Sequence, residues 1–166
     1  MQNADLHRVA LEYCLMFNKP ILNHPEVLEL TRGGVMHEGR TSLVLGLAGL
    51  PAEAEDVMTS RDIRLAESTG GRLHLANIST TGSVDIIRRV RQRGVNLTCS
   101  IAAANFALLD ESLREFDAHC KLSPPLRSRG HLESCIPGLK DGTIDVIASG
   151  HTPPASEKKL QELFLA

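Results

Sequence analysis

The stretch RLHLANISTTGSVDIIRRVRQRGVNLTCSIAA, residues 72–103, decides the fold, because a strand, a helix and a second strand follow one another within it. Residues 72–79 and 95–103 are short apolar runs without strict alternation, which is typical of strands buried on both faces. Residues 83–94 have a helical period and end at Gly94. This order predicts two parallel strands joined by a helical crossover.

The same alternation continues on both sides of this stretch. Further strands are predicted at residues 20–24 and 143–151, and further helices at residues 3–17, 50–69, 110–118, 131–142 and 156–166. One stripe of the first helix carries Leu6, Val9, Ala10, Tyr13 and Phe17. Residues 25–50 are rich in glycine and predict an irregular loop that has, or once had, a function. We expect one α/β domain over residues 1–166, with about four parallel strands joined by crossover helices.

Composition excludes several classes of protein. Of the 166 residues, 42% are hydrophobic and 23% charged, and 18 basic and 20 acidic residues are well mixed. No basic stripe indicates nucleic-acid binding, and no apolar run approaches the roughly 20 residues of a membrane span. The polar start of the chain does not resemble a signal peptide, so we expect a cytoplasmic location. The cysteines, which have no CxxC spacing, are expected to be reduced and buried.

Ligands of parallel sheets bind at the carboxyl ends of the strands, so the residues placed there are the candidates for a site. The predicted strands deliver His24, Asn77, Ser100 and His151 to these ends, and no carboxylate follows a strand directly. A zinc site needs three or four converging ligands, so two histidines favour a structural role over a metal site. His74 lies inside a strand and is expected to be a hydrogen-bonded core residue. No P-loop, dinucleotide fingerprint or nucleophile elbow is present.

Five motifs occur in an order typical of one known family. They are RDIRLAE (61–67), NIST (77–80) followed by SVDIIRR (83–89), KLSPPLR (121–127), GLKDGTIDVIASGH (138–151) and EKK (157–159). From about Gln2 to about Lys159 the sequence resembles the dihydroorotase family of the amidohydrolase superfamily. The resemblance implies a partial TIM-type (β/α) barrel, the second half of a barrel whose complete form holds a zinc centre. It also implies chemistry in which metals activate water against a cyclic amide and an aspartate moves the proton.

The resemblance also identifies which functional positions are retained. His24 falls on a metal-binding histidine, whereas Asn77 stands where the family has another histidine ligand. Gly150 replaces the aspartate that binds metal and transfers the proton. The positions of other family site residues, including the substrate contacts, carry Asn105, Ser123 and Pro154. The resemblance therefore implies a degenerate homologue with no catalytic residue, a vestigial ligand at His24 and no expected cofactor.

Three hypotheses remain open at this stage. The first is an inactive pseudoenzyme with a structural or assembly role in pyrimidine biosynthesis, since inactive members of the family serve as partners of aspartate transcarbamoylase. The second is an active zinc-dependent amide hydrolase, completed by another chain that supplies the missing ligands. The third is a remnant without a selected role. An open half-barrel has unpaired edges and an apolar face, so we expect a homodimer or a complex that covers that face.

Overall fold

The structure, a computed structural model, describes residues 1–152, 155–159 and 163, and its centre is a four-stranded parallel sheet. The strands are β1 (Ile21–Asn23), β4 (Leu73–Leu75), β5 (Leu97–Ala102) and β6 (Val146–Ala148), in the order β1-β4-β5-β6. The register pairs Leu22 with His74, His74 with Thr98, and Ser100 with Val146. The predicted parallel sheet is confirmed.

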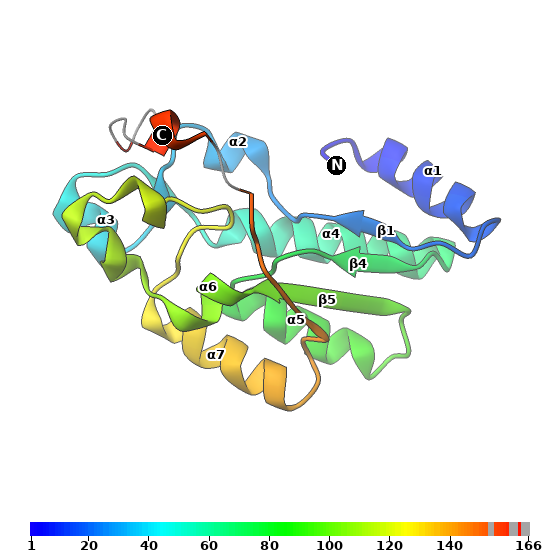
Figure 1. Cartoon of the computed structure of the whole chain (residues 1–166). Helices are drawn as coiled ribbons and strands as arrows, with labels where there is room; N and C mark the ends of the chain where they lie inside the picture. Colours follow the sequence, from blue (N-terminus) through cyan, green and yellow to red (C-terminus); the bar gives the residue numbers. More distant parts are fainter. Residues whose placement is uncertain (153–154, 160–162, 164–166) are drawn as a thin grey trace.

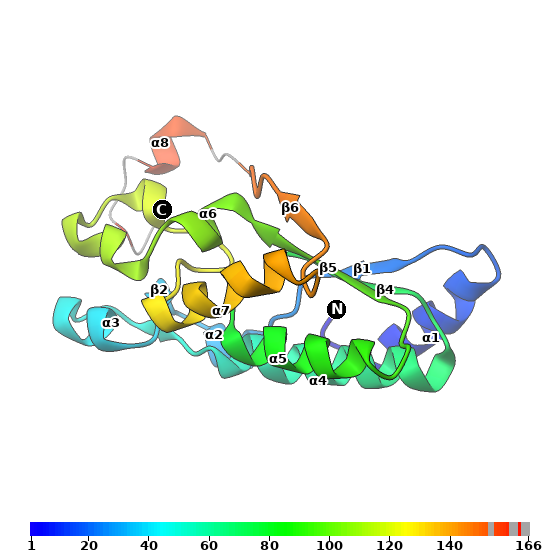
Figure 2. The ribbon, with the colours of Figure 1, turned by 90° about the horizontal axis from the view of Figure 1, so that it is seen from below.

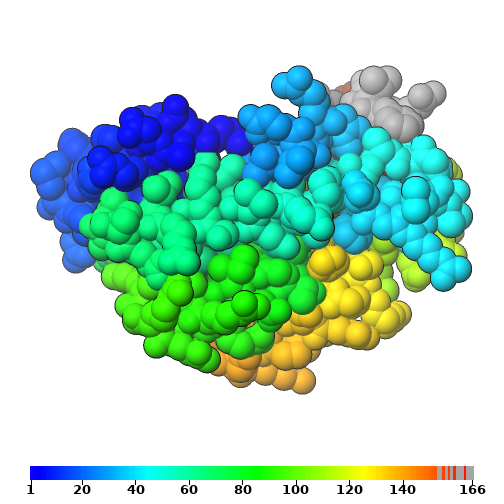
Figure 3. All heavy atoms as spheres, turned by 180° about the vertical axis from the view of Figure 1, so that it is seen from behind, coloured from blue at the N-terminus to red at the C-terminus, as the bar shows by residue number. Residues whose placement is uncertain are grey.

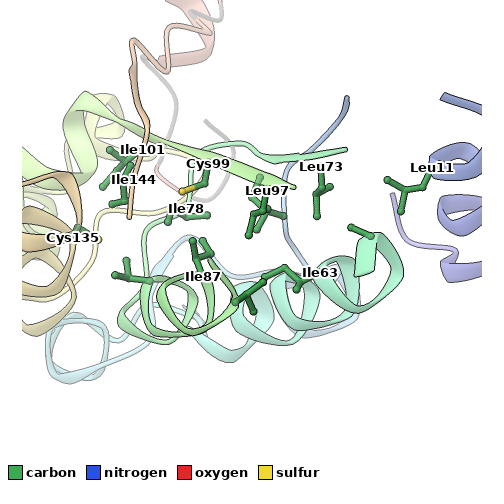
Figure 4. Close-up of a cluster of buried hydrophobic side chains, with 14 residues drawn as sticks. Leu11, Ile63, Leu73, Ile78, Ile87, Leu97, Cys99, Ile101, Cys135 and Ile144 are labelled. Atoms are coloured by element: carbon green, nitrogen blue, oxygen red, sulfur yellow. The ribbon is translucent and has the colours of Figure 1, made fainter. Parts of the chain in front are cut away.

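Helices cover one face of this sheet. They are α4 (Glu53–Thr69), α5 (Thr81–Arg91) and α7 (Arg129–Lys140). Figure 2 shows α4 and α5 beneath the strands, with β6 rising on the other side of β5, and Figure 3 shows the helices from behind as a continuous layer. Figure 4 shows Ile63 and Ile87 of the helices pointing toward Leu73 and Leu97 of the strands. The apolar strand residues at alternate positions are therefore buried against helices.

The opposite face of the sheet, which Figure 1 views, is covered by none of the helices among the described residues. Leu22 is 67% exposed there and Val146 is 48% exposed. His74 also lies on this face, where its Nδ1 is 2.9 Å from Thr98 Oγ1 and its Nε2 is 3.3 Å from Ser100 Oγ. His74 is thus hydrogen-bonded, as expected, but it belongs to the uncovered face and not to the core.

Helix α1 (Ala4–Leu15) lies alongside the outer edge of β1 and packs on α4 (Figure 1). Asn3 caps its start, since the Asn3 side chain accepts from the backbone N–H of Leu6. The residues that α1 buries are His7 and Leu11. Most of the apolar stripe predicted from the sequence faces away from the protein core. Its large members are exposed: Leu6, Val9, Tyr13 and Phe17.

The prediction of an irregular loop over residues 25–50 is wrong. The segment contains α2 (Leu28–Thr31), β2 (Met36–His37), α3 (Arg40–Leu45) and β3 (Gly49–Leu50), and β2 pairs with β3 in a second parallel sheet. Glycine allows this close pairing, because a Cβ at Gly49 would lie 2.6 Å from the Cα of Glu38. Val35 and Met36 pack here on Leu113 and Leu126 as a second cluster of buried side chains.

The second half of the chain departs from prediction in two places. The helix expected at residues 110–118 is two 3-10 turns, η1 (Asp110–Glu115) and η2 (Ala118–Cys120). A short helix, α6 (Ala103–Ala107), follows β5 directly. Of the helix expected at residues 156–166, the structure describes α8 (Ser156–Lys159), and residues 160–162 and 164–166 lie outside the described part. None of the described helices combines the length and the apolarity needed to cross a bilayer.

Candidate functional site

His24 follows β1 directly, at the carboxyl end of the sheet. Its Nδ1 is 3.1 Å from the carbonyl oxygen of Ala76, so this nitrogen carries the hydrogen and donates. Its Nε2 lies 3.9 Å from a carboxylate oxygen of Glu26. Metal-binding histidines are commonly oriented by such a bond from the other ring nitrogen to a carbonyl. His24 is therefore held through Nδ1, and Nε2 is the ring nitrogen that carries a lone pair.

Asn77 lies at the carboxyl end of the neighbouring strand, β4. Its φ is 56°, a left-handed conformation that asparagine tolerates better than most residues. Its backbone N–H donates to Ser100 Oγ at 3.1 Å, which ties the turn after β4 to β5. A neutral amide is a poor zinc ligand beside imidazole, because zinc sites in proteins use thiolate, imidazole and carboxylate.

Gly150 lies two residues after β6 and has a φ of 61°. A Cβ at this position would lie 2.9 Å from the Cβ of Ala102, closer than real Cβ contacts come. Any side chain here would therefore meet this steric contact. The left-handed backbone alone does not oppose an aspartate, since aspartate tolerates it, as asparagine does, better than most residues. The space at residue 150 suits glycine, and an aspartate would require residue 150 or Ala102 to move.

The remaining predicted positions have separate surroundings. Asn105 is buried, and its side-chain amide donates to the carbonyl oxygen of Pro125 at 2.9 Å. Asn105 thus holds the turn that contains Pro124 and Pro125. Ser123 is exposed at the start of that turn. Pro154 lies outside the described residues.

A cavity of about 190 Å³ brings two of the predicted positions, His24 and Ser123, together. Glu26, Glu55 and Lys121 also line it, whereas Asn77, Asn105 and Gly150 do not. Its volume is below the roughly 300–1,000 Å³ of typical small-molecule sites. Sequence reasoning missed Glu26 and Glu55, because neither follows a strand directly and Glu55 comes from the start of α4.

Glu55 and Arg127, which both line this cavity, form a buried ion pair with 3.4 Å between Arg127 Nη2 and Glu55 Oε2. Each is 3% exposed. The Glu55 carboxylate also accepts from the backbone N–H groups of Ser79 and Thr80, at 2.7 and 3.1 Å, and from the Ser79 hydroxyl. A carboxylate so fully bonded is occupied in fixing the turn after β4 and the start of α5, and it has little capacity to act as a base.

Two histidines lie beside Arg127. His37 Nδ1 is 3.3 Å from a guanidinium nitrogen of Arg127, and the ring of His131 meets the ring of His37 edge-on at 5.0 Å. Burial, helped by the positive charge of Arg127, lowers the pKa of His37 to about 4. Burial also lowers the pKa of His131, again with help from Arg127. Both rings are neutral near pH 7, so the guanidinium is the cation of this cluster.

The donor set present does not fit a zinc centre. Among residues 1–152, 155–159 and 163, no three histidine, cysteine, aspartate or glutamate side chains are placed to hold one metal ion. His24 offers one oriented nitrogen, Asn77 a neutral amide and Gly150 no side chain. Cys99 and Cys135 are buried in the core and add no thiolates, because burial raises the pKa of each thiol to about 12.

Comparison with known sequences gives close relatives over the whole chain. A dihydroorotase of Pelotomaculum thermopropionicum is 49% identical over all 166 residues, which are 39% of that protein. A dihydroorotase of Acetivibrio thermocellus is 45% identical with the same coverage. A Rhodopirellula baltica protein with a provisional dihydroorotase name is 50% identical, and 36% of it is covered. No protein-family model matches the chain.

Solved structures show the same fold. A D-hydantoinase from a Bacillus species has a TM-score of 0.83 and 23% identity, covering 96% of this chain and 37% of that one. A dihydropyrimidinase from Brevibacillus agri has a TM-score of 0.81 and 24% identity, with 96% and 36% covered. The expected partial TIM-type (β/α) barrel is confirmed. The chain is a homologue of the dihydroorotases along its whole length and spans little more than a third of the curated relatives it matches.

Proposed function

We propose, from its homology to the dihydroorotases, that this chain is a dihydroorotase-like protein without hydrolase activity of its own and with a structural or assembly role in pyrimidine biosynthesis. The observation that carries the proposal is Gly150. Its close approach to Ala102 suits a residue without a side chain. The loss of the aspartate is thus matched by the local fold, and a single substitution would not restore the group in place.

The chemistry explains why this loss matters. Hydrolysis of a cyclic amide needs an activated water and a group that delivers a proton to the leaving nitrogen. Proton transfer by a positioned side chain contributes roughly 10²–10⁴-fold, and metal activation of water adds to it. Gly150 supplies neither a ligand nor a proton carrier, and Asn77 does not replace an imidazole.

The remaining polar groups support structure. Glu55 and Arg127 fix the turn after β4, and Asn105 fixes the proline turn. These bonds stabilise the fold at a place where the proposed catalytic groups are missing. A protein with a binding or assembly role needs a stable fold but does not need catalytic groups. The proposed setting is the cytoplasm, and the candidate partner is aspartate transcarbamoylase, which co-elution of the two purified proteins would test.

The proposal is tested by measuring bound zinc and dihydroorotate turnover on the purified chain. We expect less than a tenth of an equivalent of zinc after dialysis and no turnover above buffer. The double variant Asn77→His, Gly150→Asp is the control. It should show no turnover, because a side chain at residue 150 would meet Ala102 and the chain would still lack the other metal ligands. One or two equivalents of zinc together with turnover in the unaltered chain would overturn the proposal.

One observation favours a second candidate, an active hydrolase completed by another chain. His24 is oriented as a metal ligand, with Nδ1 on the Ala76 carbonyl. Under this alternative a second polypeptide supplies the other ligands and the proton carrier. Mixing the chain with the barrel segment of a dihydroorotase that carries the His-x-His pair would give zinc-dependent turnover. A His24→Ala variant would abolish that turnover, whereas the first proposal expects none in either mixture.

A further inference from the structure

We infer that two copies of this chain close one eight-stranded barrel, in which β6 of each copy pairs with β1 of the other. This inference goes beyond the proposed function, because it names a second copy as the occupant of the uncovered sheet face. It rests on three features of the described residues: the two free sheet edges, the exposed stripe of α1 and the uncharged character of the open face.

The two sheet edges are complementary under a twofold rotation. Within the described part of the chain, β1 lies at one edge, β6 at the other, and all four strands run in the same direction. A twofold axis parallel to the strands preserves that direction, so a second copy presents its β1 beside β6 and its β6 beside β1. Four strands from each copy give eight, the number at which a parallel barrel closes around a filled interior.

The helical side supplies a matching pair of apolar surfaces. Ile147 of β6 is in register with Ile101, which is buried under the helices, yet Ile147 itself is 55% exposed. Helix α1 lies alongside the outer edge of β1 and turns an apolar stripe outward, including Tyr13 at 59% exposure. Pairing β6 with the β1 of a second copy places Ile147 beneath that copy's α1. The exposed side chain of Ile147 and the apolar stripe of α1 thereby bury each other.

The open face of the sheet is suited to a shared interior. The register places seven uncharged side chains on it: Leu22, His74, Thr98, Ser100, Ala102, Val146 and Ala148. Two of its large apolar members, Leu22 and Val146, are 67% and 48% exposed. A face that remained in contact with solvent would usually carry charged groups, whereas large apolar patches on a soluble chain indicate association. Closed twofold assembly uses the same patch on both copies and leaves neither edge free.

The test is sedimentation of the full chain at micromolar concentration. We expect twice the chain mass for the unaltered protein, and the single chain mass for Ile147→Lys and for Tyr13→Glu. Leu43→Lys is the matched control, because Leu43 on α3 is 82% exposed and belongs to neither surface. That variant should stay dimeric.

Mixing separates a lost interface from a lost fold. Combining Ile147→Lys with Tyr13→Glu places lysine against glutamate at one junction and leaves the other junction unaltered, so the mixture should sediment as a dimer. A monomeric unaltered chain, dimers in both single variants, or equal disruption by Leu43→Lys would overturn the inference. The sedimentation experiment measures mass, so its result does not depend on zinc content or turnover. The dimer inference and the proposed function can therefore fail separately.

Discussion

At the scale of single residues, the fold depends on polar groups that the sheet and its helices enclose. Glu55 and Arg127 are 72 positions apart in the chain and meet between the start of α4 and the proline turn. A buried ion pair adds little beyond its apolar replacement, but removing one partner leaves an unpaired buried charge. The contribution of each partner is therefore best measured by its removal.

We expect Arg127→Met to lower the free energy of unfolding by about 3–5 kcal/mol, because Glu55 would lose its counter-charge inside the protein. Arg114→Met is the matched control, since Arg114 pairs with Glu111 at the surface. Exposed pairs contribute about 0–1 kcal/mol, so this variant should unfold almost as the unaltered chain does. Urea denaturation followed by circular dichroism measures both, and equal losses would contradict the assignment.

His37 should make stability fall as the solution becomes acidic. Its folded pKa of about 4 lies below the ordinary value of 6.5, so between these values the unfolded chain binds the proton more readily. The contribution of His37 to the free energy of unfolding is therefore fully present above about pH 6.5. It declines as the pH falls toward 4, by at most about 3 kcal/mol. Unfolding midpoints of His37→Gln between pH 7 and pH 4.5 should vary less than those of the unaltered chain. An equally steep decline in the variant would exclude His37 as the cause.

Gly150→Asp should destabilise the chain and, under the proposed function, should not confer turnover of dihydroorotate. A φ of 61° costs most residues with a side chain roughly 1–2 kcal/mol, and aspartate less, so the contact with Ala102 is expected to supply most of the loss. Thermal unfolding is the measurement, with Gly142→Asp as the control, because Gly142 shares the positive φ but has no atom within 4 Å of its Cβ position. A larger loss at position 150 is expected, and a gain of stability there would contradict the structural account of this residue.

At the scale of elements, the sequence identifies the regular strands and crossover helices but not the short pieces. Strands such as β5 are apolar runs bounded by glycine and polar residues, and a helix such as α4 has a clear period and ends at Gly70, so both could be predicted. The two-residue strands β2 and β3 are too short to show a period. Their pairing depends on contacts between segments, which no local pattern indicates.

The pairing of β2 with β3 gives a direct test. Gly49→Ala should cost about 1–3 kcal/mol, because the added methyl group would meet the backbone of Glu38. Gly130→Ala is the control in helix α7, where a Cβ has open space and alanine is the better helix former by up to about 1 kcal/mol. Denaturation midpoints should move in opposite directions. A neutral Gly49→Ala would show that the two strands are not packed as described.

At the scale of the whole molecule, residue types at the altered positions could be read from the sequence, whereas their surroundings could not. Aligning the motifs is enough to identify the residue types at these positions, which are His24, Asn77 and Gly150. The cavity beside His24 depends on Glu26, Lys121 and the proline turn, which come from distant parts of the chain. The exposed stripe of α1 also could not be foreseen, because a helical period shows an apolar face but not what covers it.

The most direct test of the central claim is hydrolysis of dihydroorotate by the purified chain after incubation with excess zinc chloride. The account predicts a rate equal to that of buffer with zinc alone, because it proposes that Gly150 stands where the dihydroorotases have the aspartate that carries the proton to the leaving nitrogen. A zinc-dependent rate that rises in proportion to the concentration of the chain, and that is lost in His24→Ala, would contradict it.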